Sequence, residues 1–163
     1  MAPSGVNKGQ ITPAQLVIVD EQQNVIDGEG RASAETTLHI EIIKKLKCSA
    51  VLHTHSIYAT VLSDYFEKQG AIRLEDWEML KGIKGISTHK TSIDIPIVAN
   101  NQDMKELSRV VYNHLNSNIP GILVAGHGLY AWGDSLAEAQ RHVEILEFLF
   151  SAVWHKQLLP PVR

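Results

Sequence analysis

Apolar and polar residues follow two different periods along this chain, and segments of the two kinds succeed one another over its whole length. Apolar residues at about every fourth position predict amphipathic helices in residues 31–47, 56–68, 100–117 and from Ser135 onward. Short runs rich in β-branched residues predict strands between these helices. No internal repeat, low-complexity block or Pro/Gly/Ser-rich linker divides the chain. We therefore expect a single α/β domain over residues 1–163.

Each predicted helix has an apolar face that should pack on a sheet. The first helix is expected to start with Ser33 as its N-cap, and the last starts with Ser135 and Glu138 at capping-box spacing. Pro160 and Pro161 close the chain after that helix. The apolar positions of the four helices are, in chain order, Leu38, Ile42 and Leu46; Ile57, Val61 and Tyr65; Met104, Leu107, Val111 and Leu115; and Leu136, Ala139, Val143, Leu146 and Val153.

The strands are predicted from apolar alternation and from the turn residues around it. QLVIVD and NVIDG flank the polar residues EQQ, as the two strands of a hairpin would. AVLHTH is a short strand that leads into the next helix, and EDWEMLKGI has the pattern of a short helix or turn. TSIDIPIVA places Ile93, Ile95 and Ile97 on one face, and Pro96 favours an edge position in the sheet. GILVAGHGLYAWG is predicted to form two strands that bend at glycines.

Composition and charge exclude several classes of protein. The chain is 44% hydrophobic and 20% charged, which is typical of a globular protein with a buried core. A formal net charge of -3 without a basic stripe argues against nucleic acid as a partner. The single cysteine, Cys48, excludes an internal disulfide and a cysteine-rich zinc module. Because the chain also has neither an apolar leader nor an apolar run of roughly 20 residues, we expect no membrane span and a cytoplasmic location.

Two histidines lie one residue apart in AVLHTH, at the end of a predicted strand. Side chains at positions i and i+2 of a strand point to the same side, about 6.5–7 Å apart, so His53 and His55 could both face one metal ion. A third ligand is then needed, and His127 is the best candidate because glycines on both sides let its backbone approach another element. From spacing alone, the alternative that these are unrelated histidines stays open. We expect packing or surface roles for most of the others, His39, His89, His114, His142 and His155.

Two carboxylates are candidates for proton transfer. Glu35 lies in the first turn predicted for its helix, where the helix dipole stabilises a negative charge, so it is either a functional residue or a helix-start residue. Glu78 lies between Trp77 and Met79, and an apolar pocket there would raise the pKa of its carboxyl group toward the range useful in acid–base catalysis. An exposed position for Glu78 is the alternative.

Five motifs of this sequence resemble those of the class II aldolase/adducin family: the APSG-x-x-K-G start, SAETTLH, HTHS, WEMLKG and AGHGLYAWG. The resemblance covers about Ala2 to Lys156. WEMLKG together with HGLYAWG is most similar to the branch that dehydrates 5-methylthioribulose 1-phosphate in methionine salvage. Membership implies a three-layer α/β/α fold with a mainly antiparallel central sheet. It also implies a homotetramer with active sites at the subunit boundaries.

The resemblance implies roles for individual residues. The zinc ligands of the family, one ion per subunit, fall on His53, His55 and His127, and the acid–base of the dehydratase branch falls on Glu78. Glu35 matches a position that serves as an acid–base or as an extra metal ligand in the aldolase branch. The phosphate of the sugar substrate would be held by the matching small polar positions, Ser4, Gly5 and Ser33.

Relatives of this kind carry a further helix and a Ser-Gly-Asn loop before the APSG-like turn, and that loop contributes to binding phosphate. This sequence starts at the turn, so it is either a shortened product or a protein that lacks part of the phosphate site. Two alternatives to the dehydratase therefore stay open. One is a sugar-phosphate aldolase, which uses the same metal chemistry to break a carbon–carbon bond. The other is a catalytically impaired scaffold or interaction protein of the same fold.

Overall fold

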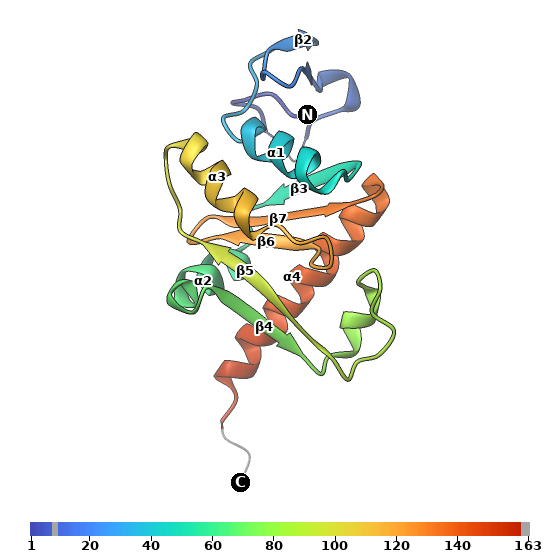
Figure 1. Ribbon diagram of the computed structural model, residues 1–163, viewed down its shortest axis with the longest axis vertical. Coiled ribbons are helices and arrows are strands. Elements are labelled where there is room, and N and C mark those ends of the chain that lie inside the picture. The colour runs from blue at the N-terminus through green and yellow to red at the C-terminus, as the bar shows by residue number, and fades with distance from the viewer. Residues whose placement is uncertain (8–9, 161–163) are drawn as a thin grey trace.

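Five strands form the central sheet of the computed structural model, which describes residues 1–7 and 10–160 (Figure 1). The strand order is β3–β7–β6–β5–β4, where β3 is Ala50–Thr54, β4 Ala71–Glu75, β5 Ser92–Val98, β6 Gly121–Val124 and β7 Gly128–Gly133. The pairs β3–β7, β7–β6 and β5–β4 are antiparallel, and β6–β5 is parallel. Among the described strands the sheet is thus mainly antiparallel, which confirms the expected sheet type.

Helices cover both faces of this sheet (Figure 1). Helices α2 (Ile57–Tyr65) and α4 (Leu136–Leu158) pack on one face, and α1 (Thr36–Leu46) and α3 (Met104–His114) pack on the other. The predicted three-layer α/β/α fold is confirmed. The remaining elements are the hairpin β1 (Ile18–Val19) and β2 (Val25–Asp27) and the short 3-10 helices η1 (Pro13–Gln15), η2 (Glu67–Gln69) and η3 (Glu78–Gly82).

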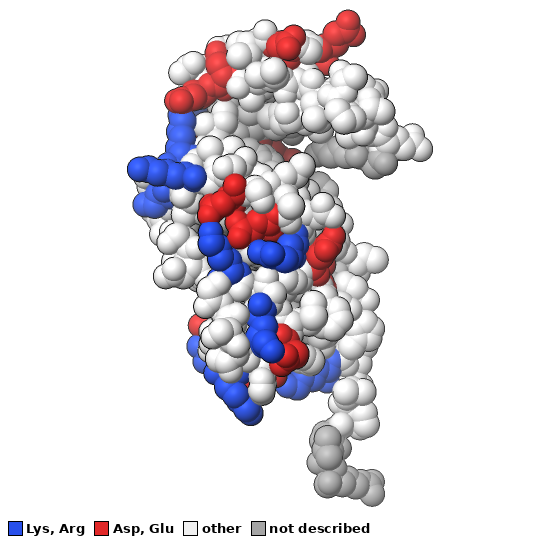
Figure 2. Space-filling model, turned by 90° about the vertical axis from the view of Figure 1, so that its right-hand side faces the viewer, with Lys and Arg blue, Asp and Glu red and all other residues white. Residues whose placement is uncertain are grey.

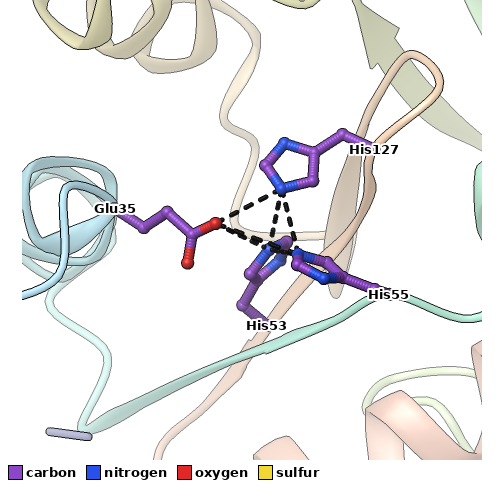
Figure 3. Close-up of side chains that lie close together, drawn as sticks. All are labelled: Glu35, His53, His55 and His127. Carbon is purple, nitrogen blue, oxygen red and sulfur yellow. Dashed lines mark hydrogen bonds and ion pairs between the residues drawn. The ribbon is translucent and has the colours of Figure 1, made fainter. Parts of the chain in front are cut away.

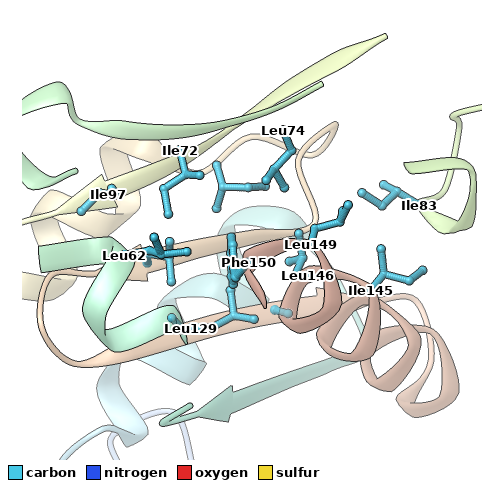
Figure 4. Close-up of a cluster of buried hydrophobic side chains, with 14 of the residues drawn as sticks. Leu62, Ile72, Leu74, Ile83, Ile97, Leu129, Ile145, Leu146, Leu149 and Phe150 are labelled. Carbon is cyan, nitrogen blue, oxygen red and sulfur yellow. The ribbon is translucent and has the colours of Figure 1, made fainter. Parts of the chain in front are cut away.

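Strand alternation divides the apolar side chains between two cores. Leu129 and Ala131 of β7 face α4, whereas Tyr130 and Trp132 face α1 and α3. The larger core lies between the sheet and helices α2 and α4, with Phe150 at its centre (Figure 4). The two cores lie on either side of the sheet, as the period-2 pattern of a strand requires.

Most of the predicted helix faces are buried, but two are not as predicted. Ile57 is 78% exposed, and Val61 and Tyr65 of the same helix are also exposed. The side of α2 that packs on the core carries Ala59, Leu62 and Ser63 instead. Leu136 opens α4 and is likewise exposed, so packing of that helix starts at Ala139.

Two further local predictions need correction. Ser33 is not the N-cap of α1, because the helix starts at Thr36 with Glu35 in the cap position, and Ser33 instead accepts a hydrogen bond from the Glu35 N–H (3.4 Å). Pro96 is not on an edge strand, because β5 lies between β4 and β6. The proline is tolerated there because pairing of β5 with β6 begins one residue later, so the missing N–H falls outside that ladder.

The capping box at α4 is confirmed in part. The Ser135 Oγ accepts from the Glu138 N–H (3.1 Å), but the Glu138 carboxylate accepts from the N–H of Asp134 (2.6 Å), one residue before the cap.

Lys8 and Gly9 of the APSG-x-x-K-G motif, and Pro161, lie outside the described residues. Within residues 1–7 and 10–160, no helix has both the length and the apolar character of a transmembrane span. Figure 2 shows acidic and basic side chains interspersed on one face.

Two phenylalanines of α4 provide a test of the core. Phe150 is fully buried and Phe148 is about half exposed on the same helix. We expect Phe150→Ala to lower the free energy of unfolding by about 3–5 kcal/mol, because it removes apolar contacts and leaves a cavity. Phe148→Ala, the matched control, should change it by less than about 1 kcal/mol. Urea unfolding measures both values, and similar losses in the two variants would contradict this assignment of the core.

Candidate metal centre

His53 of β3 and His55, the residue after the end of β3, point to the same place (Figure 3). His53 is the fourth residue of β3, opposite Tyr130 of β7, and His55 follows the last strand residue. Their Nε2 atoms are 2.7 Å apart. The strand geometry therefore brings the two imidazoles together, with His53 almost fully buried and His55 about half exposed.

His127 reaches the same point from the turn between β6 and β7. Its Nε2 lies 3.3 Å from that of His53 and 3.0 Å from that of His55. Both neighbouring glycines are required for this approach. Gly126 has a φ of +62°, which favours glycine, and a Cβ on Gly128 would lie 2.1 Å from the carbonyl oxygen of Thr54.

Glu35 is the fourth member of this cluster, at the start of α1. Its Oε1 atom lies 3.3 Å from the Nε2 of His127, 3.4 Å from that of His53 and 3.9 Å from that of His55. The side chain is only 17% exposed. The structure thus places Glu35 beside the three histidines, in a position that its place in a helix start did not by itself specify.

These four groups fit a metal ion. One ligand atom from each lies within 4.8 Å of all the others. Ligand atoms held about 2.0–2.2 Å from a tetrahedral zinc ion are about 3.3–3.5 Å apart from one another, which falls inside the observed range of 2.7–3.9 Å. Imidazole nitrogens and a carboxylate oxygen are ligands for zinc and other divalent transition metals. The cluster is therefore able to bind a metal ion.

The ring of His53 is held in the orientation that a metal ligand needs. Its Nδ1 lies 2.8 Å from the carbonyl oxygen of Leu129, which can only accept, so Nδ1 carries the proton and Nε2 offers a lone pair to the cluster. The ring also stacks on Tyr130, with centroids 4.0 Å apart and planes at 14°. Burial, and then the charge of Glu35, raise the pKa of the Tyr130 phenol, so this ring stays neutral.

The role of Tyr130 in holding His53 was not predicted. The signal lies in the strand register, because Tyr130 stands opposite His53 across the β3–β7 ladder. That register depends on pairing between segments some 75 residues apart and is not visible in either segment alone.

Glu78 lies apart from this cluster. It is the first residue of η3, its side chain is 69% exposed, and its carboxylate pairs with the Lys81 amine (2.6 Å) and the His89 Nδ1 (3.5 Å). The hydrogen bond from Lys81 is the main cause that lowers the pKa of this carboxyl group. Of the two alternatives, the apolar pocket with a raised pKa is wrong and the exposed position is confirmed, because the side chain points to solvent and to a cation.

Glu78 is separated from the histidines both across the sheet and along the direction of its strands. Strand β4, which precedes η3, and strand β3 are the two edges of the sheet, four strand spacings or about 19 Å apart. The strands also run so that His55 and Ala71 lie at one end of the sheet, whereas Glu75 and the following η3 lie at the other. Glu78 is thus diagonally across the sheet from the cluster.

The three predicted phosphate-binding positions lie near the start of α1. Ser4 donates its N–H to the carbonyl of Arg31 (2.8 Å), and Pro3 forms a bridge with Ala32. In this antiparallel pairing Ser4 faces Arg31, whereas Ser33 lies on the other side of the Pro3–Ala32 bridge, two residues before Glu35. Ser33 thus lies next to the start of α1, and Ser4 lies on the segment that pairs with the residues before it.

Comparison with known proteins gives the same family as the sequence motifs. Residues 1–154 match the class II aldolase and adducin N-terminal domain family. The chain is 44% identical over 149 residues to a methylthioribulose-1-phosphate dehydratase of Stenotrophomonas maltophilia, covering 90% of this chain and 70% of the relative. It is 41% identical over 151 residues to the enzyme of that name in Hahella chejuensis, covering 91% and 73%.

Solved structures show the same fold. YgbL of Escherichia coli superposes with a TM-score of 0.79 at 23% identity, covering 99% of this chain and 74% of that one. The L-fuculose-1-phosphate aldolase of Thermus thermophilus superposes with a TM-score of 0.74 at 24% identity, covering 96% and 77%. With the family match over residues 1–154, these findings establish that the chain belongs to the class II aldolase and adducin family.

Proposed function

We propose that this chain is a metal-dependent hydro-lyase that converts 5-methylthioribulose 1-phosphate into 2,3-diketo-5-methylthiopentyl 1-phosphate in methionine salvage. The observation that carries the proposal is the cluster of three histidines and Glu35. The substrate comes from relatives at 41–44% identity that are named for this dehydration. The predicted cytoplasmic location stays a prediction.

We assign His53, His55 and His127 as the protein ligands of one zinc ion. Bound there, the metal supplies Lewis acidity, which polarises the substrate carbonyl and makes the proton on the neighbouring C3 acidic. His55 is the most exposed of the three histidines, so substrate would enter on its side. Glu35 supplies negative charge beside all three imidazoles, as a further ligand or as a proton acceptor.

Glu78 is our candidate for the acid–base residue. Its lowered pKa keeps the carboxylate ionised at neutral pH, and this is the form that accepts a proton. Glu78 could remove the C3 proton or deliver a proton to the departing C4 hydroxyl. If it takes the C3 proton first, the carboxyl group could return that proton in the later step.

Because Glu78 lies diagonally across the sheet from the cluster, we propose that it serves the metal centre of a second copy of the chain. Such a contact between two different corners of identical chains can repeat around a closed assembly, as in the expected homotetramer. The exposed apolar side chains of Ile57, Val61 and Tyr65 support the same arrangement. They begin two residues after His55, next to where the second copy would sit.

The N-terminal turn is our candidate for the phosphate site. Ser4 and Gly5 lie on the segment that pairs with residues 31–32, just before Ser33 and the start of α1, and hydroxyl and backbone N–H groups of this kind can bind an anion. Glu35 belongs to the same helix start, so phosphate bound there would place the rest of the substrate toward the metal ligands.

We expect purified protein to contain about one transition-metal ion per chain. His127→Ala should lose most of this metal, because it removes one of the converging ligands. His114→Ala is the control, since His114 lies on α3 outside the cluster. Elemental analysis of the wild type and the two variants measures their metal content, and circular dichroism shows whether each is folded. Folded wild-type protein without metal would favour the scaffold alternative.

We expect Glu78→Gln to lower the turnover of 5-methylthioribulose 1-phosphate by about 10²–10⁴-fold with unchanged metal content, because the amide cannot accept a proton. Glu67→Gln changes an exposed carboxylate of η2 and should leave turnover near that of the wild type. Ordinary turnover in Glu78→Gln would remove this residue from the mechanism. Cleavage of a carbon–carbon bond by the wild-type protein, without dehydration, would favour the aldolase alternative.

Mixed oligomers test whether Glu78 acts on a second copy. Glu78→Gln and His127→Ala should each be nearly inactive alone, whereas an equal mixture assembled together should regain up to about a quarter of wild-type activity, because such mixing pairs an intact metal centre with an intact Glu78 in that share of the sites. The double variant Glu78→Gln/His127→Ala mixed with Glu78→Gln is the control and should stay inactive. No recovery in the first mixture, with mixed oligomers present, would place both residues in the same chain's site.

A further inference from the structure

Helix α2 connects the second histidine of the cluster to the third. It begins at Ile57, two residues after His55, and Ser56 caps it by accepting from the Ala59 N–H (3.0 Å). One face of this helix lies against the turn that carries His127. His55 and His127, which are 72 residues apart in the sequence, are thus linked through a single short helix.

Two hydroxyl groups of α2 make this link. The Oγ1 of Thr60 donates to the carbonyl oxygen of His127 (3.0 Å), and the Oγ of Ser63 accepts from the Gly126 N–H (3.1 Å). Ser63 is fully buried, and its own proton is directed to the carbonyl oxygen of Thr60 (3.0 Å) or of Val124 (3.3 Å). The peptide groups before Gly126 and after His127 are therefore both held by the helix.

The hydrogen bond from Thr60 restricts the backbone at His127 and so affects the direction in which the His127 imidazole points. The His127 carbonyl belongs to the peptide unit that joins His127 to Gly128, and Gly126 has a backbone conformation in the left-handed region. A turn that contains two glycines has many other conformations open to it, because glycine restricts φ and ψ least. A contact on either side of His127 selects one of them.

We propose that Thr60 is a positioning residue for the metal centre, which orients His127 through the carbonyl of that residue. The inference rests on the metal centre of the proposed function. Groups that fix a ligand in this way commonly change metal affinity by 10- to 100-fold when they are removed. Ser63 holds the Gly126 side of the same turn by accepting a hydrogen bond from the Gly126 N–H.

The test compares Thr60→Val, which keeps the branched shape and removes the hydroxyl, with Thr60→Ser, which keeps the hydroxyl. Ser63→Ala removes the second bond independently, and Ser151→Ala removes a helical hydroxyl of α4 that contacts His155. Zinc affinity is measured by competition with a chelator. The absorption spectrum of the cobalt-substituted protein reports ligand geometry, and thermal unfolding of the metal-free protein reports the fold.

We expect Thr60→Val to weaken zinc binding by about 10- to 100-fold and to alter the cobalt spectrum. The midpoint of unfolding of the metal-free protein should fall by no more than about 4 °C, the effect of one hydrogen bond. Thr60→Ser should restore affinity and spectrum, Ser63→Ala should weaken affinity in the same direction, and Ser151→Ala should resemble the wild type.

Three results would overturn the inference. Wild-type affinity and spectrum in Thr60→Val would show that the hydroxyl does not orient His127. Equal losses in Thr60→Val and Thr60→Ser would assign the effect to packing. If Thr60→Val does not fold, unchanged zinc affinity in Ser63→Ala would count against positioning of the turn by α2. Failure of the wild-type protein to bind zinc is a different result, because it would overturn the metal centre itself.

Discussion

The approach of the β6–β7 turn to the end of β3 is the contact on which the candidate site depends. Gly128 lies so close to Thr54 that a single added carbon would collide with the Thr54 carbonyl oxygen. Thr54 stands between His53 and His55 in the chain, and His127 stands next to Gly128. Without this close approach, the third imidazole could not reach the other two.

The sheet supplies the rigid frame for that contact, and the two cores hold the frame from both sides. On one side, α1 packs on β6 and β7 and carries Glu35 at its start. On the other side, α2 and α4 pack on the same strands, and α2 holds the turn of His127. Helices α1 and α2, on opposite faces of the sheet, thus contribute to the cluster and to the turn beside it.

The two carboxylates that the proposed chemistry uses stand in different surroundings. Glu35 is largely buried beside three imidazoles, whereas Glu78 is exposed, paired with Lys81 and kept ionised. The fold places them at opposite corners of one chain. In the assembly that we propose, the two corners come from different chains, and catalysis and association then depend on the same surfaces.

The sequence by itself determined the order of the helices and strands and indicated three histidines as candidate ligands, because local periodicity and glycine-flanked histidines are visible within short segments. The three-layer class came from the resemblance of its motifs to the class II aldolase and adducin family. Only the tertiary structure decided that Glu35 lies beside the histidines, that Ile57 faces outward and that Glu78 lies across the sheet. Pro96 was misplaced for the same reason. Strand order, register and the packing of one element on another join segments far apart in the chain, and no local pattern specifies them.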